Sequence, residues 1–400
     1  MQRHLIRRFI LVVASLGFLG SGAWAGEGGA AAAAAVTVEG LQQVAQYNFA
    51  IHILAMLLVG FGFLMVFVRR YGYGATTGTY LVVAVGIPLY VLLRGSGILC
   101  HEPIAPSTIK ALLYAEFAVA SALIAMGAVL GRLRVFQYML LALFLVPAYL
   151  LNEWLVLDGG LGVTHGFVDT AGSIIIHAFG AYFGLGLSLA LTTALQRRQP
   201  ITVDITSDRF AMLGSMVLWL FWPSFCSAIV SAEELPRTAM NTVLSLSGAT
   251  ISTYLLSTLL RKGKTSFGDM ANAALAGGVA IGATCNVVAP VVAFAIGLLA
   301  GAVCVIGYVF VQPALEKRFK LVDTCGVHNL HGMPGLLGGL IAILAVPGVA
   351  VAQLAGIIFT VVLALGSGLV AGVLIKATGT THLAYEDREE FSGVEAGGEP

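Results

Sequence analysis

Two apolar segments of the chain begin with the same short sequence and carry histidine side chains. An Asp-Thr-x-Gly pattern occupies residues 169–172 and again 323–326; the apolar run that follows holds His177 in the first case, and His328 and His331 in the second. Ionisable side chains are costly inside membrane helices, where they usually mark a transport pathway or a proton relay. The pattern therefore indicates a duplicated transporter with a conduit lined by histidines.

Each aspartate of this pattern stands where a helix is expected to begin. A carboxylate at that position satisfies amide donors of the first turn, and its charge suits the positive end of the helix dipole. Asp169 and Asp323 could therefore act as helix caps alone, or could also orient the pore and stabilise passing cations.

The histidines lie at different distances from these aspartates. His177 is eight residues beyond Asp169, about 12 Å along a helix, and His328 is five residues beyond Asp323. Burial favours neutral imidazole, and a neutral pair can share one proton while it offers a donor and an acceptor to a small polar solute. For His331, one turn after His328, local packing or hydrogen bonding is favoured over a place in the same pore wall.

The composition is that of an integral membrane protein. Of the 400 residues, 58% are hydrophobic and only 10% are charged, whereas soluble domains carry about 25% charged residues. The net charge of +1 gives no indication of nucleic-acid binding. The five cysteines form no C-x-x-C pair, and no H-E-x-x-H sequence occurs, so we expect no metal, no cofactor and no catalytic residue, and an intramembrane metalloenzyme is disfavoured.

The chain divides into four expected parts. Residues 1–25 have the basic start, short apolar core and small-residue cleavage site of a signal peptide, with an uncleaved first span as the alternative. A linker at 26–40, a membrane domain at 41–376 and a loosely ordered acidic tail at 377–400 follow. Since a membrane span needs about 20 apolar residues, the domain is expected to contain eleven transmembrane helices: 41–68, 79–100, 108–131, 135–157, 170–195, 209–231, 237–260, 269–288, 290–311, 324–346 and 348–376.

The distribution of basic residues orients these helices. Every second loop carries arginine or lysine, as at 69–70, 132–134 and 197–198, and such loops face the cytoplasm. The N-terminus of the mature chain is then outside and the C-terminus inside. The two Asp-Thr-x-Gly segments enter from opposite faces, so we expect an all-α fold with an inverted five-plus-five repeat, one extra helix and a site near the membrane midplane.

Several long motifs resemble signatures of the ammonium transporter/Rhesus family. They occupy residues 169–185, 218–225, 237–243 and 323–335, and they occur in the family's order. The resemblance covers the whole expected membrane domain, and bacterial members of the Rhesus branch look most similar.

The resemblance implies a homotrimer in the bacterial inner membrane, in which each eleven-helix subunit has its own pore. The family's twin pore histidines match His177 and His328, so that the second histidine would follow its aspartate by five residues rather than eight. The two stacked phenylalanines of the outer gate match Phe117 and Phe225. Aromatic side chains in membrane helices usually only pack, and the resemblance alone assigns these two a role.

The resemblance also implies roles for acidic residues and shows two departures. Asp169 and Asp323 match the family's pattern, and Glu153 is similar to an outer-vestibule carboxylate of the Rhesus branch. Cys226 stands where asparagine commonly follows the second gate phenylalanine, and Ile229 stands where the ammonium transporter branch has a cation-binding serine. Weak recruitment of ammonium is therefore expected.

One further carboxylate lies inside an expected span. Glu116 directly precedes Phe117, and an intramembrane carboxylate suggests a function on physical grounds alone. Arg94 is a possible ion-pair partner for Glu116, although its long side chain could instead reach the outer membrane surface.

The function expected from these features is channel-like transport of ammonia and ammonium. An acidic outer vestibule would attract the cation, and the gate rings would add about 1–2 kcal/mol of cation–π attraction. Deprotonation would then precede passage, because a bare ion in an apolar lumen incurs a large desolvation cost. The alternatives are a carbon dioxide channel and an ammonium sensor that signals through a separate partner.

Overall fold

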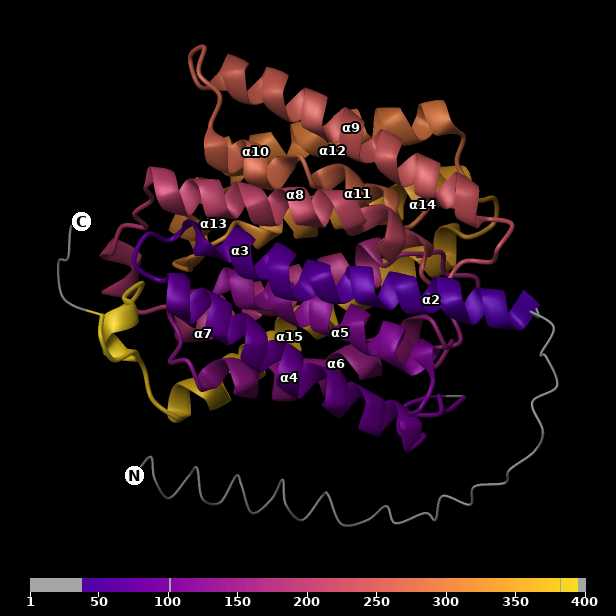
Figure 1. Cartoon of the computed structure of the whole chain (residues 1–400), viewed down its shortest axis with the longest axis horizontal. Coiled ribbons are helices and arrows are strands. Elements are labelled where there is room, and N and C mark those ends of the chain that lie inside the picture. Colours follow the sequence, from indigo (N-terminus) through magenta and orange to yellow (C-terminus); the bar gives the residue numbers. More distant parts are fainter. Residues whose placement is uncertain (1–37, 101, 382, 395–400) are drawn as a thin grey trace, which may run out of the picture. The chain divides into compact units, whose positions relative to one another are not determined.

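Continuous apolar sequence forms helices throughout the part of the chain that the structure describes. The computed structural model describes residues 38–100, 102–381 and 383–394, and within these ranges all regular elements are helices. A helix satisfies its backbone donors and acceptors internally, which a membrane demands. The expected signal peptide and residues 26–37 of the expected linker lie outside the described residues. The chain is therefore an all-α integral membrane protein, as expected (Figure 1).

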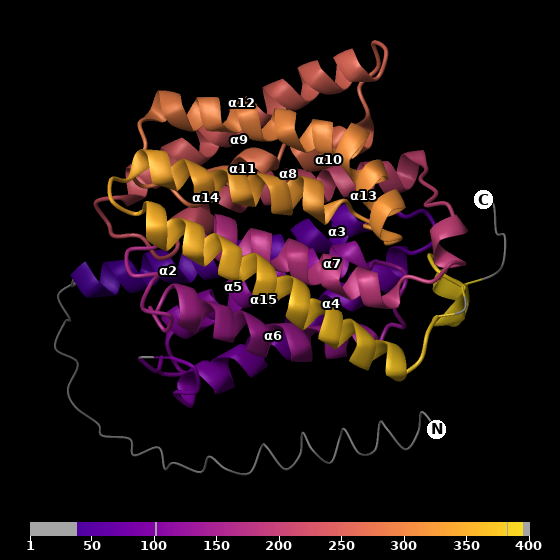
Figure 2. The same cartoon turned by 180° about the vertical axis from the view of Figure 1, so that it is seen from behind.

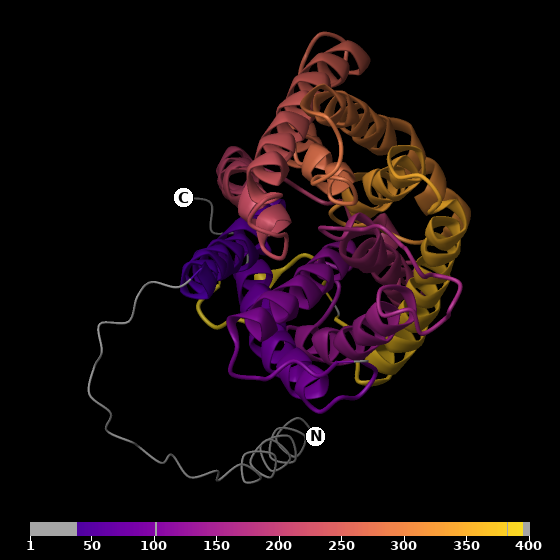
Figure 3. The same ribbon diagram turned by 90° about the vertical axis from the view of Figure 1, so that its right-hand side faces the viewer.

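Nine helical segments within the described ranges are long and apolar enough to cross a membrane. They are Gly40–Phe67 (α2 Val38–Ala55, η1 Met56–Phe61, α3 Gly62–Leu64 and η2 Met65–Phe67), Gly72–Gly95 (α4), Ile109–Ala128 (α5), Gln137–Val156 (α6), Ser173–Leu191 (η3 Ser173–Ala178 and α7 Phe179–Leu191), Ile205–Ser227 (α8), Leu235–Leu260 (α9), Pro290–Phe319 (α12 Pro290–Ile306, η5 Gly307–Val311 and α13 Gln312–Phe319) and Ala350–Ala377 (α15). Figures 2 and 3 show them from two further directions.

Two of the expected eleven spans are built from shorter helices. The segment expected at 269–288 forms α10 (Phe267–Ala273) and α11 (Ala276–Ile281). The segment expected at 324–346 forms η6 (His328–Gly332) followed by α14 (Met333–Ala345). The first of these segments, Phe267–Ile281, is shorter than the about 20 residues that a span needs, and neither segment is among the nine long apolar spans of the described residues.

Glycines allow the most extensive helix pairs to approach closely. In the pair α9 and α12, a methyl group at Gly297 would lie only 1.9 Å from the backbone oxygen of Ser245. In the pair α7 and α15, a methyl group at Gly368 would lie 2.2 Å from the backbone oxygen of Phe183. Small residues at such crossings let backbones pack directly in lipid, and they bring the helices that surround the histidines into fixed positions.

The acidic tail is more ordered than the sequence suggested. The segment 383–394 packs back onto the start of α4, where the carboxylate of Asp387 accepts hydrogen bonds from the backbone amides of Tyr73 at 2.8 Å and Gly74 at 2.7 Å. Asp387 thus satisfies two of the free amides that every helix start leaves. The expectation of a loosely ordered tail is wrong for this segment, because the carboxylate of Asp387 caps a helix more than 300 positions earlier in the sequence.

Candidate functional site

Both histidine segments begin with the same local geometry. Gly172 has φ of +77° and Gly326 has φ of +68°, a left-handed conformation that favours glycine. The helix that carries His177 begins directly after the first glycine, as η3, and the helix that carries His331 begins two residues after the second, as η6. The repeated glycine is therefore needed for the turn into each helix.

Both aspartates cap these helices, but Asp169 accepts hydrogen bonds through one carboxylate oxygen and Asp323 through both. In Asp169 a single oxygen, Oδ2, accepts from the backbone amides of Ile174 at 2.9 Å and Ile175 at 2.8 Å. In Asp323 each oxygen accepts one hydrogen bond, Oδ1 from the backbone amide of Val327 and Oδ2 from that of His328, both at 2.9 Å. Both carboxylates thus fix the first turn of a histidine helix.

Each helix start is also joined to a neighbouring helix end through backbone hydrogen bonds. The amide of Ala171 donates to the carbonyl of Gly282 at 2.8 Å, and the amide of Cys325 donates to the carbonyl of Gly127 at 3.1 Å. Ala171 and Cys325 occupy the same place in the two Asp-Thr-x-Gly sequences. The likeness of the two segments therefore extends from sequence to the way each is anchored.

The structure brings His331, and not His328, to His177. The Nδ1 atoms of His177 and His331 are 3.2 Å apart, and their rings are stacked with centroids 5.3 Å apart and an interplanar angle of 10°. Both side chains are buried. His328 instead meets the ring of Tyr182 edge on, at 5.7 Å. The pairing of His177 with His328 that the resemblance implied is not the one that the contacts show.

A signal in the sequence could have found this pair. His177 lies eight residues after Asp169 and five after Gly172, and His331 lies eight residues after Asp323 and five after Gly326. The equal spacing makes His331 the counterpart of His177 in the repeated sequence, whereas the resemblance to the family had been matched to His328.

A row of aromatic rings leads from the gate candidates to the histidines. The rings of Phe117 and Phe225 meet at 4.9 Å with an angle of 62°, and Phe225 lies 6.0 Å from the ring of His177. Beyond the histidine pair, Phe61 stacks against His331 at 6.4 Å. The phenylalanines are in contact edge to face rather than stacked flat. With the histidines they form a continuous series of ring contacts from α5 through α8, η3 and η6 to η1.

Trp222 is a member of this group that the sequence did not identify. Its ring lies flat against His177, with centroids 5.6 Å apart and an angle of 21°, and it is buried. Trp222 precedes Phe225 by three residues, a spacing that places both on one face of a helix. The three-residue spacing from the gate candidate Phe225 could have indicated Trp222 in the sequence. No feature of the sequence pointed to Phe61.

Pockets lie at both ends of the row. Tyr114, whose ring meets Phe117 at 6.1 Å, lines a pocket of about 520 Å³ whose charged residues are Arg94, Glu102, Lys110 and Asp158. At the other end, a narrow space of about 20 Å³ borders Phe61 and His331. It shares Leu64, Phe67, Asn272 and Cys325 with a pocket of about 370 Å³. A larger apolar pocket of about 720 Å³ between α8 and α9 is not lined by these rings.

Two buried carboxylates, Glu153 and Glu116, line neither the 520 Å³ nor the 370 Å³ pocket. Glu153 is buried and accepts a hydrogen bond from the hydroxyl of Tyr90 at 2.7 Å. Glu116 is fully buried, and neither of its oxygens has a hydrogen-bond partner among the described residues. Arg94 pairs with Asp158 at 3.1 Å. The two arrangements expected for it were an ion pair with Glu116 and a side chain that reaches the outer membrane surface. Among the described acidic residues, Asp158 and Glu102 line the 520 Å³ pocket.

Cys226 directly follows the gate candidate Phe225 in the sequence. Its side chain is buried and is a free thiol, like the other four cysteines. Ile229, the second departure from the family's pattern, lies two residues after the end of α8 and is exposed. Within the described ranges, no three His, Cys, Asp or Glu side chains gather as a metal site would require.

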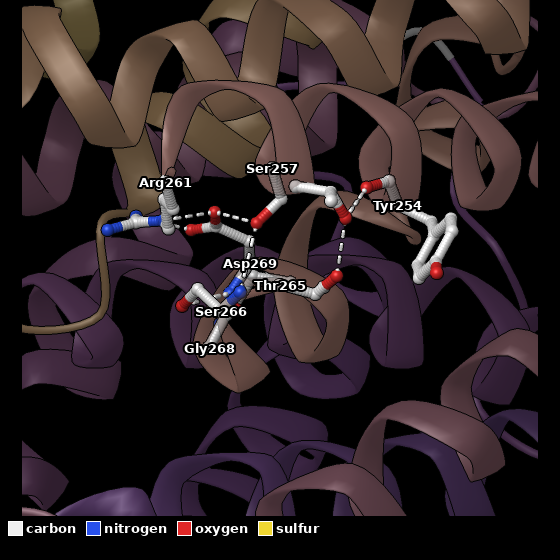
Figure 4. A network of polar contacts seen from close by, with 9 residues as sticks. Tyr254, Ser257, Arg261, Thr265, Ser266, Gly268 and Asp269 are labelled. Carbon is white, nitrogen blue, oxygen red and sulfur yellow. Dashed lines mark hydrogen bonds and ion pairs between the residues drawn. The ribbon is translucent and has the colours of Figure 1, made fainter. Parts of the chain in front are cut away.

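A polar network borders the 370 Å³ pocket (Figure 4). The guanidinium of Arg261 donates to both oxygens of Asp269 at 2.7 Å, and the hydroxyl of Ser257 donates to Asp269 at 2.7 Å. The amide of Ser266 donates to Ser257 at 3.0 Å. Bidentate pairing of this kind fixes geometry as well as charge, and here it fastens the start of α10 to the end of α9 beside the pocket.

A second polar chain holds the segment that contains Asp169. The hydroxyl of Thr170 donates to Oδ1 of Asn286 at 2.8 Å, and the amide of Asn286 donates to Glu234 at 2.7 Å. The hydroxyl of Ser231 donates to the same carboxylate at 2.8 Å. These donors favour the ionised form, Asn286 most, and therefore lower the pKa of Glu234.

Acid should loosen this chain of hydrogen bonds. Because the pKa of Glu234 is lowered by folding, its contribution is present above the usual glutamate pKa of about 4.3 and is lost as the pH falls through the folded value. Hydrogen–deuterium exchange of residues 168–172, corrected for intrinsic rates, should rise in this acid range. Glu234→Gln should remove the pH dependence, and an identical rise in that variant would contradict the assignment.

Comparison with known proteins gives one consistent relationship. The chain matches the Ammonium Transporter Family over residues 8–397. It is 45% identical over 297 residues to ammonium transporter Rh type B of Oryctolagus cuniculus and 42% identical over 295 residues to that of Homo sapiens. Each match covers 72% of this chain and 63% of the relative, so the chain spans less than two thirds of the length of these relatives.

Solved structures agree with this relationship. Rh50 of Nitrosomonas europaea, from the Rhesus protein family of channels, is 68% identical with a TM-score of 0.89, and the match covers 90% of this chain and 94% of that one. A sensor Amt protein is similar in fold alone, with 20% identity, a TM-score of 0.76 and coverage of 88% and 97%.

Proposed function

Because this chain belongs to the Ammonium Transporter Family, we propose that it conducts ammonia across a membrane through a pore lined by His177 and His331. The observation that carries the proposal is the pair itself. Two buried imidazoles from separate helices lie in contact behind two phenylalanine rings, and pockets lie at both ends of this row. The name of the Rh type B relatives, ammonium transporter, supports ammonium as the transported species. The proposed role is transport and not catalysis.

The geometry of the pair suits a small polar solute. With Nδ1 atoms 3.2 Å apart, one imidazole must donate its proton to the other. The donor ring then keeps a lone pair on its Nε2, while the acceptor ring carries a hydrogen on its Nε2. The Nε2 of His177 has no hydrogen-bond partner among the described residues. A passing ammonia molecule could therefore find one acceptor and one donor.

The proposed path begins at the 520 Å³ pocket. The pocket offers ammonium the carboxylates of Glu102 and Asp158, which Arg94 and Lys110 balance in charge. Phe117 and Phe225 then admit the cation, with cation–π attraction of about 1–2 kcal/mol. Ammonium loses its proton before the lumen, since an ion among apolar walls is strongly disfavoured. Ammonia then passes the two histidines and regains a proton in the 370 Å³ pocket.

The remaining site residues take supporting roles in this proposal. Asp169 and Asp323 hold the two histidine helices in place. His328 stands one turn from His331 beside Tyr182 and is a secondary pore residue. Glu116 and Cys226 are buried next to Phe117 and Phe225 in the sequence, Glu153 is buried against Tyr90, and none of the three lines either pocket.

The proposed architecture has eleven membrane-crossing segments. Nine are the long spans, and the other two are α10 with α11 and η6 with α14. The matching anchors at Ala171 and Cys325 support an inverted five-plus-five repeat with α15 as the extra helix. We propose a homotrimer in a bacterial inner membrane, with the N-terminus outside after removal of a signal peptide and the C-terminal tail in the cytoplasm.

Flux in proteoliposomes tests the proposal. Vesicles with the protein should alkalinise faster than empty vesicles after an ammonium gradient is applied, and equal rates would contradict ammonia transport. Acidification by a carbon dioxide gradient in the same vesicles separates the alternative gas channel. Current on a solid-supported membrane then shows whether charge crosses with the ammonia.

A further inference from the structure

The first membrane helix makes a polar contact with the gate helix that the transport path does not use. His52 lies in α2, and its Nδ1 is 2.9 Å from the hydroxyl oxygen of Ser224 in α8. The same imidazole stacks on Phe221, with ring centroids 4.7 Å apart and planes at 21°. A histidine in a membrane helix is costly and calls for a reason. Its two partners, Phe221 and Ser224, lie within four sequence positions of the gate residue Phe225.

The gate helix needs support at this place because Pro223 lies inside it. Proline has no amide hydrogen, so the carbonyl of Trp219, four residues earlier, loses its usual partner in the helix. Side-chain contacts hold α8 on both sides of the break. Before it, the indole of Trp219 donates to Thr250 of α9 at 3.3 Å; after it, Ser224 bonds to His52.

The helix that carries His52 also touches the histidine pair. Phe61, in η1 directly after α2, stacks against His331 at 6.4 Å. Phe61 follows His52 by nine positions, about 14 Å along a helix. In Figure 1, α2 and α3 run alongside α8, and η1 contacts α8 closely. One helix therefore contacts both the gate helix and the second histidine.

We propose that His52 is a positioning residue for the gate, and that through Ser224 and Phe221 it keeps Phe225 against Phe117 and so sets the size of solute that passes. This rests on the proposed function. The contacts of His52 are with Ser224 and Phe221 rather than with Phe117, Phe225 or His177, so its effect must act through α8. A ring held in place admits ammonia, and a released ring admits the larger methylamine more easily.

The test is the ratio of methylamine to ammonia permeability, measured by stopped-flow alkalinisation of proteoliposomes. His52→Ala should raise this ratio at least threefold. Ser224→Ala should raise it too, and the double variant should raise it no more than the larger single change, because both remove one contact. His52→Phe keeps the ring on Phe221 but loses the hydrogen bond, and should give an intermediate ratio.

A matched control separates gating from general loosening. Thr360→Val removes a buried hydrogen bond between helices, from Thr360 to Asn152 at 3.1 Å, away from the gate, and should leave the ratio unchanged. An unchanged ratio in both His52→Ala and Ser224→Ala, or additive shifts in the double variant, overturns the proposal. If His52→Ala fails to fold, Ser224→Ala and His52→Phe decide. Wild-type ammonia flux in the same preparation tests the proposed function separately.

Discussion

Replacing His331 with leucine should lower ammonia flux about tenfold, whereas the same change at His328 should lower it less than twofold. Leucine fills similar volume but offers no hydrogen bond. Ammonia would then pass the leucine with one hydrogen bond fewer, a loss of roughly 1–1.5 kcal/mol. A difference of about 1.4 kcal/mol corresponds to a tenfold change in rate. His331 lies against His177, while His328 lies against Tyr182. Stopped-flow alkalinisation of proteoliposomes at equal protein content measures both.

His177→Leu is the companion of this experiment. It should reproduce the loss seen in His331→Leu, since each imidazole is the hydrogen-bond partner of the other. Comparable thermal stability of the three variants in detergent is the control for folding. A larger loss in His328→Leu than in His331→Leu would show that the contact at 3.2 Å is not the functional one.

Replacing Asp169 with alanine should reduce flux more than tenfold and lower the thermal stability of the protein. The change leaves the amides of Ile174 and Ile175 without their acceptor, and each buried unpaired donor costs about 1–3 kcal/mol. The first turn of η3, and with it His177, would lose its position. Flux in proteoliposomes and unfolding temperature in detergent, followed by tryptophan fluorescence, measure the two effects.

Asparagine at the two aspartates separates capping from charge. In Asp169 one oxygen accepts both bonds, and Oδ1 has no hydrogen-bond partner among the described residues. Asp169→Asn can therefore keep both bonds and should retain most of the flux. In Asp323 each oxygen accepts one bond, so Asp323→Asn must lose one and should be the more damaging change. Equal loss in both asparagine variants would mean that charge, and not capping, is what the pore requires.

The parts that the sequence could predict are those that depend on local pattern. Long apolar runs predicted the membrane helices, and the repeated Asp-Thr-x-Gly predicted two capped helix starts, because a cap and a left-handed glycine act within a few residues. Gate candidates Phe117 and Phe225 came only from the resemblance, and the structure places their rings in contact. Their gating role remains a proposal.

The parts that could not be predicted depend on distant contacts. Arg94 meets Asp158, and His52 meets Ser224, across 172 positions of sequence. The choice between His328 and His331 is different, since the spacing of eight from each aspartate was present in the sequence and was outweighed by the family match. The ordered tail was missed because acidic composition does not reveal that Asp387 caps α4.

The most direct test of the central claim is the ammonia permeability of proteoliposomes that contain the wild-type chain or the His177→Leu/His331→Leu double variant, at equal protein content. If ammonia crosses at the histidine pair, wild-type vesicles alkalinise several times faster than empty ones, and the folded double variant falls to near the empty-vesicle rate. A folded double variant that conducts ammonia as fast as the wild type would contradict the account.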